Sequence, residues 1–181
     1  MPVSVFLSHP QPVNDEQKEF IGKLSLWLGT RGFMPRTLGV TDYSDAAPLE
    51  GIRGLMSECN GLICIAFRRT HVESGTKTVR VGKNYQSKPM NDQWLTSPWA
   101  QIEPAMAYQI GLPVLVLRES GVLDDGVLEK GIIGLYMPEF DLGISDDEHY
   151  LDSQEWVQIS TGWEQHVRTV VRNKGRPPKL Y

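Results

Sequence analysis

Continuously apolar runs alternate with segments of helical periodicity along this 181-residue chain. The clearest runs are GLICIAF at 61–67 and PVLVL at 113–117, and VSVFLSH at 3–9 is a third. A strand that is apolar at every position is buried on both faces, which is typical of a parallel sheet covered by helices. We therefore predict an α/β fold of the flavodoxin-like, doubly wound kind, with about five parallel strands and helices on both faces.

Weaker patterns complete the predicted sheet and its helical layers. Residues 32–39 and 132–140 are expected to form two further strands, and Pro35 suits only an edge position in the first of them. The other expected helices span residues 14–32, 48–59, 122–131 and about 153–174. We expect the whole chain, residues 1–181, to form one domain with a core of about 3–140.

Polar stretches interrupt this alternation. Residues 68–95 lack helical periodicity, and a connection of this length is usually functional or partly disordered. The stretch SDDEH at 145–149 is expected to be a solvated acidic loop, and residues 176–181 a tail.

Composition excludes several classes of function. The net charge of −4 and the lack of a basic block argue against a nucleic-acid partner. No apolar run is long enough to span a bilayer. Cys59 and Cys64 lack a zinc spacing and are expected to be buried thiols, so we predict no metal site. Few cysteines and no signal peptide predict a cytoplasmic protein.

Ligands of open parallel sheets bind at the carboxyl ends of the strands. The residues expected at this edge are Ser8, His9, Arg36, Tyr43, Arg68, Arg69, Arg118 and Glu119. Ser8 and His9 are candidates to contact a ribose or a phosphate. Arg36 either holds a phosphate through its two-pronged guanidinium or is a solvated edge residue, and the same alternatives apply to Arg68 and Arg69.

An acid stands near the start of the helix that precedes the strand at 113–117. Ser97 and Pro98 form a good cap and first turn, whereas Pro104 disfavours helical geometry at Glu103. The helix therefore begins either at Pro98, with a kink, or at Pro104. Glu103 either complements the helix dipole or serves as a catalytic carboxylate near the mouth of a cleft.

Four segments together resemble the Toll/interleukin-1 receptor (TIR) domain family: VFLSH at 5–9, GVTDYSDAAPLEGI at 39–52, IRGLMSECNGLICIAF at 52–67 and SPWAQIEPAMAYQIGLPVLVL at 97–117. The family has a serine, a tryptophan and, four positions later, a glutamate; Ser97, Trp99 and Glu103 match them. The glycine–proline bend before the last strand is also similar to the nucleoside 2-deoxyribosyltransferases. The chain departs from the family at Ala100 and Pro104 and by its long insert.

This resemblance implies a bacterial antiphage enzyme of the Thoeris-like type. Its substrate would be NAD, with no further cofactor, and it would yield ADP-ribose or a cyclic ADP-ribose signal read by a separate effector protein. Glu103 would be catalytic, while Trp99 and Tyr43 would stack on nicotinamide or adenine unless they serve packing. The alternatives are a nucleoside deoxyribosyltransferase or nucleotide N-glycosidase, and a non-catalytic adaptor that self-associates through residues 40–48. A homo-oligomer is compatible with each.

Overall fold

The computed structural model describes residues 2–133, 137–143, 149–173 and 175–177. Most of the predicted acidic loop at 145–149 and of the tail at 176–181 therefore lies outside the described residues. The strands are β1 (Val3–Ser8), β2 (Phe33–Arg36), β3 (Leu62–Ala66), β4 (Thr70–Val72), β5 (Thr76–Val81), β6 (Asn84–Pro89), β7 (Gln93–Leu95), β8 (Val114–Glu119) and β9 (Glu139–Phe140). The α-helices are α1 (Asp15–Thr30), α2 (Pro48–Ser57), α3 (Trp99–Gln109) and α4 (Gln154–Arg172).

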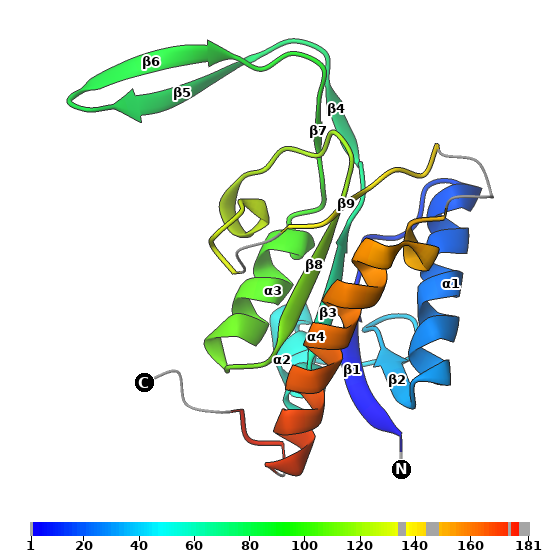
Figure 1. The fold of residues 1–181 in the computed structure, drawn as a ribbon. Coiled ribbons are helices and arrows are strands. Elements are labelled where there is room, and N and C mark those ends of the chain that lie inside the picture. The colour runs from blue at the N-terminus through cyan, green and yellow to red at the C-terminus, as the bar shows by residue number, and fades with distance from the viewer. Residues whose placement is uncertain (1, 134–136, 144–148, 174, 178–181) are drawn as a thin grey trace.

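The central sheet contains five parallel strands in the order β2-β1-β3-β8-β9. Helices α1 and α4 pack on one face, and α2 and α3 pack on the other (Figure 1). This arrangement confirms the predicted flavodoxin-like, doubly wound fold. The strand order reverses between β1 and β3, which is the topological switch point where ligands of this fold bind. Pro35 lies in the edge strand β2, as expected.

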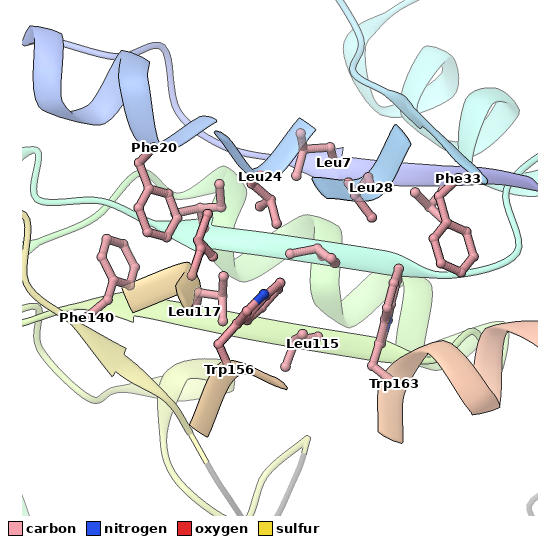
Figure 2. Close-up of a cluster of buried hydrophobic side chains, with 14 of the residues drawn as sticks. Leu7, Phe20, Leu24, Leu28, Phe33, Leu115, Leu117, Phe140, Trp156 and Trp163 are labelled. Atoms are coloured by element: carbon pink, nitrogen blue, oxygen red, sulfur yellow. The ribbon is translucent and has the colours of Figure 1, made fainter. Parts of the chain in front are cut away.

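The central strand β3 is apolar at every position because both of its faces are buried. In β3, Ile63 and Ile65 join the cluster beneath α1 and α4, whereas Leu62 and Cys64 join the cluster beneath α2 and α3. Figure 2 shows the first cluster, in which Phe20, Phe140 and Trp156 are among the large side chains. The rings of Phe20 and Phe140 stack with their centroids 4.3 Å apart.

The helix ends follow from local side-chain chemistry. Asn14 caps α1 by accepting a hydrogen bond from the Gln17 amide at 2.8 Å, and Gly32, with φ of 79°, follows the end of the helix. Pro48 occupies the first turn of α2, where a missing N–H costs no helical hydrogen bond. Ile52, Leu55 and Met56 of α2 are buried, whereas Leu49 is 52% exposed because this first turn lies outside the buried cluster.

The polar insert 68–95 is built from β-strands. Strands β4 and β7 form an antiparallel stem, and β5 and β6 form a second antiparallel ribbon that extends away from the sheet (Figure 1). We name the ribbon of residues 76–89 the arm. The insert therefore has regular strand structure, which the lack of helical periodicity left open.

The region after β8 has less regular structure than predicted. The helix expected at 122–131 is a single 3₁₀ turn, Gly126–Leu128, and of the strand expected at 132–140 only β9 forms among the described residues. Residues 134–136 lie outside the described part of the chain. None of the helices that the structure describes combines the length and hydropathy needed to cross a membrane.

Candidate active site

The helix that carries Glu103 begins at the carboxyl edge of the sheet. Its first residue is Trp99, whose amide donates to the Ser97 hydroxyl at 3.3 Å, and Pro98 is the residue before it. Of the two alternatives for this segment, the earlier start is correct, and Pro104 lies inside α3. Glu103 is therefore in the second turn, partly buried, with its backbone fixed by the helix.

Pro104 leaves a carbonyl group inside the helix without its usual partner. A proline has no N–H, so the carbonyl oxygen four residues earlier, that of Ala100, receives no helical hydrogen bond from it. The Cys64 thiol instead donates to this oxygen across 3.8 Å. Cys64 comes from β3, so this contact ties α3 to the centre of the sheet.

Ser8 links this contact to the acid. Ser8 and Cys64 are paired in the register of β1 and β3, and Ser8 Oγ lies 3.6 Å from Cys64 Sγ. Ser8 also hydrogen-bonds to the Glu103 side chain. A chain of contacts thus runs from Ala100 through Cys64 and Ser8 to the Glu103 carboxyl group.

Burial raises the pKa of Glu103 to about 7, although the hydrogen bond from Ser8 acts in the opposite direction. The Ser8 hydroxyl has one hydrogen and two acceptors, Glu103 and Cys64. An ionised carboxylate is the stronger acceptor, so Ser8 then donates to Glu103. When Glu103 is protonated, its own O–H can donate to Ser8 Oγ while the Ser8 hydrogen points to Cys64 Sγ.

Glu103 faces a cleft of about 420 Å³ at the switch point between β1 and β3. The cleft is lined by His9, Pro10, Gln11, Leu38, Pro48, Ile52, Arg69, Ser97, Trp99 and Glu103. Of the predicted site residues, His9, Ser97, Trp99 and Glu103 are therefore brought together, with Ser8 bonded to Glu103. Trp99 keeps 39% of its surface exposed at this position.

His9 presents a hydrogen-bond acceptor at the cleft. Burial lowers its pKa, so the ring is neutral at pH 7. Its Nδ1 lies 3.0 Å from the Pro10 carbonyl oxygen, which can only accept. Nδ1 therefore carries the hydrogen, and Nε2 has a lone pair available for a substrate hydroxyl.

Arg69 is the cation of the cleft. Its Nη1 donates to the Gln11 carbonyl, and the described part of the chain gives its other N–H groups no partner. Arg69 therefore retains donors for a phosphate. The neighbouring Arg68 has a structural role: its Nε donates to the Ser120 carbonyl at 2.5 Å, and the guanidinium pairs with the buried Glu119 at 3.7 Å.

The structure does not place Arg36 or Tyr43 among the cleft residues. The Arg36 guanidinium is bound by Asp42 at 2.5 Å and by Glu58 at 2.6 Å, and both contacts raise its pKa. The guanidinium donors of Arg36 are thus occupied by carboxylates, so the structure does not favour the alternative in which Arg36 holds a phosphate. Tyr43 is 82% exposed, and its hydroxyl donates to the Val40 carbonyl at 3.2 Å.

Two cavities larger than this cleft lie in other parts of the structure, and none of the described residues that line them is a buried acid. One of about 490 Å³ lies between the start of β8 and α4, and one of about 780 Å³ lies along α3. The acids of the second, Asp125 and Glu129, are exposed. No cluster of three or more His, Cys, Asp or Glu side chains in the described residues is arranged to hold a metal ion.

Several cleft residues were not singled out from the sequence. Gln11 follows β1, and Pro48 and Ile52 belong to the helix that follows β2, so all three obey the rule that points to the carboxyl edge. Cys64 was correctly predicted to be a buried thiol. Its contact with Ser8 depends on strand register, which the apolar run alone does not reveal.

The structure of the chain is similar to solved structures, whereas its sequence matches no known family or curated protein. No protein-family model matches the sequence. No curated protein matches it. The structure is similar to that of the CMP N-glycosidase BcmB from Clostridium botulinum, with 15% sequence identity, a TM-score of 0.47, and coverage of 86% of this chain and 98% of that chain.

Proposed function

We propose that this protein is an enzyme that breaks the N-glycosidic bond of a nucleotide, with NAD as its substrate and Glu103 as its catalytic group. The observation that carries the proposal is one partly buried carboxyl group, held by Ser8 at the switch-point cleft. Membership of the TIR family and a role in antiphage signalling belong to the same proposal, and they rest on the sequence resemblance.

The chemistry requires one negative charge near the sugar. When the bond between ribose C1′ and the nicotinamide nitrogen breaks, its electron pair goes to the nitrogen, and the cationic pyridinium leaves as neutral nicotinamide. The ribosyl group then carries positive charge in an oxocarbenium-like transition state. A desolvated carboxylate at Glu103 stabilises this charge more strongly than one in water. Water, or a nucleophile within the substrate, then forms the new bond to C1′.

The other cleft residues suit the remaining parts of a nucleotide. His9 Nε2 and the Ser97 hydroxyl can bind ribose hydroxyls, and the exposed ring surface of Trp99 can stack on a base. Arg69 can donate to a phosphate. Each role uses a group that lines the cleft, and none requires a metal or a further cofactor.

One observation favours a second candidate, a nucleotide N-glycosidase or deoxyribosyltransferase acting on an ordinary nucleoside base. Because the pKa of Glu103 is about 7, a substantial fraction of the carboxyl groups is protonated at neutral pH. A neutral base leaves more readily when it receives a proton, whereas nicotinamide leaving NAD does not need one. The protonated form of Glu103 can supply that proton.

The alternative of a non-catalytic adaptor depends on residues 40–48 and not on the carboxyl group of Glu103. In the loop 40–48, Val40 and Tyr43 are 59% and 82% exposed, which is compatible with self-association through this loop. Such a protein would release no base at any concentration.

A substrate panel tests these alternatives. Concentrated protein is incubated separately with NAD, with nucleoside monophosphates including CMP, and with deoxynucleosides. Released base is measured by chromatography and the sugar product by mass. The proposal predicts nicotinamide with ADP-ribose or its cyclic form. Base release from the monophosphates or deoxynucleosides alone would establish the second candidate, and no release from any substrate would overturn the enzymatic assignment.

A further inference from the structure

The arm gathers positive charge in a protein that is acidic elsewhere. Residues 76–91 contain Lys77, Arg80, Lys83 and Lys88 and no Asp or Glu. Removing these four from the 18 Lys and Arg leaves 14 against 22 Asp and Glu, a net charge of −8 for the rest of the chain. The whole-chain charge of −4 therefore conceals a basic ribbon.

Three of these cations have no acidic partner among the described residues. Lys77, at the base of the arm, pairs with Asp125 at 2.9 Å. Arg80 donates only to the Gly82 carbonyl, at 3.1 Å, and Lys83 and Lys88 are exposed. Lys88 lies directly opposite Lys77 in the ribbon, and of the two only Lys77 has a carboxylate partner among the described residues.

The side chains of the arm resemble a phosphate-binding surface more than a protein interface. Val81 and Tyr85 are its large exposed apolar residues, at 47% and 75%. A stable contact with a second copy of the chain needs an apolar core of several hundred Å². Beside its cations, the arm carries hydroxyl and amide side chains, namely Thr76, Thr78, Asn84, Gln86 and Ser87. Such groups, with arginine and lysine, contact nucleic-acid backbones, and a tyrosine ring can stack on a base.

The tip of the arm is also far enough from the acidic remainder of the chain for solvent to screen the negative charge of that remainder. Six residues per strand give a ribbon about 20 Å long. The Debye length at physiological ionic strength is about 8 Å, so solvent screens the charge of the body at the tip. A two-stranded ribbon of this kind also fits the major groove of a DNA duplex.

We propose that the arm is a docking site for the phosphate backbone of a nucleic acid. The inference does not depend on the proposed function of the cleft. It replaces the expectation drawn from the net charge, which averages over the whole chain. Arg80, Lys83 and Lys88 provide the phosphate contacts. The ring of Tyr85 can stack on a base when the nucleic acid is single-stranded.

Fluorescence anisotropy with labelled DNA tests the proposal on the full chain. The probes are a 20-base-pair duplex and one of its single strands. The triple variant Arg80→Ser, Lys83→Ser and Lys88→Ser is compared with a matched control, Lys18→Ser, Arg53→Ser and Arg176→Ser, which removes the same charge from exposed positions elsewhere. Circular dichroism verifies that both variants are folded.

We expect the unmodified protein and the control to bind at least one probe at 50 mM salt. With about three phosphate contacts on a duplex, affinity should fall about 40-fold between 50 and 200 mM salt. The arm variant should lose this binding. Absence of binding at 50 mM salt, or equal binding by the two variants, overturns the proposal. Self-association that depends on the arm, without nucleic-acid binding, would also overturn it and would assign the arm to a second copy of the chain.

Discussion

Ser8 hydrogen-bonds to the carboxyl group of Glu103, although one residue ends the first strand and the other lies on a helix in the second half of the chain. The contact follows from topology. Strands β1 and β3 are neighbours, α3 packs on the face to which Ser8 and Cys64 point, and all of these elements meet at the switch point. The fold thereby places a hydroxyl donor beneath an acid that burial would otherwise keep protonated.

The activity on NAD should rise with pH through about 7. The proposed mechanism requires an ionised carboxylate, and the pKa of Glu103 is about 7 because of burial. A profile of kcat/KM between pH 5 and 9 should be low at pH 5 and level off near pH 8. A profile that falls above pH 7 would instead indicate that the protonated acid acts, as in the nucleotide N-glycosidase alternative.

Removing the Ser8 hydroxyl should shift that profile. Ser8→Ala deletes the hydrogen bond that lowers the pKa of Glu103, so the midpoint should move to higher pH. The rate at pH 7 should therefore fall, because less of Glu103 is ionised, and it should recover toward pH 9. Ser4→Ala, at the start of the same strand, serves as a control and should keep the original midpoint. An unchanged midpoint in Ser8→Ala would show that the hydroxyl does not tune the acid.

Glu103 should destabilise the folded protein above neutral pH. Its pKa is raised from 4.5 to about 7, so the folded state binds more protons than the unfolded state in this window, and stability falls as the pH rises through it. Urea unfolding should show Glu103→Gln to be more stable than the unmodified protein by about 1–3 kcal/mol at pH 8. The difference should vanish near pH 4. A difference independent of pH would contradict this account.

Arg69 should matter for phosphorylated substrates in particular. Arg69→Ala removes the cation of the cleft, and we expect KM to rise about 10-fold for a nucleotide. A nucleoside without a phosphate should show little change. Arg53→Ala removes an exposed arginine outside the cleft lining and is the matched control. Equal effects on nucleotide and nucleoside would exclude a phosphate contact.

The sheet and the edge that bears the site could be predicted because burial on two faces leaves a clear pattern. The apolar runs of β1, β3 and β8 indicated a parallel sheet, and the carboxyl-edge rule then grouped Ser8, His9 and Glu103. The length of α3 could not be decided from the sequence. Pro104 cannot donate a hydrogen bond to the Ala100 carbonyl oxygen, and the sequence does not show that the Cys64 thiol donates to it instead.

The remaining differences come from contacts that no local pattern encodes. Arg36 follows β2 as expected, yet Asp42 and Glu58 fold back to bind it, so its position in the sequence did not reveal its partners. The arm escaped prediction because both faces of the ribbon are largely solvent-exposed and polar. The apolar alternation that usually marks a strand is therefore weak there.

Nicotinamide release by Glu103→Gln, measured at pH 8 beside the unmodified protein, tests the central claim most directly. Glutamine keeps the shape and the contact with Ser8 but cannot carry the negative charge. We predict a loss of at least 1,000-fold in kcat, about 4 kcal/mol of transition-state stabilisation, with circular dichroism unchanged. Release at the unmodified rate by this variant would contradict the assignment of Glu103 as the catalytic group.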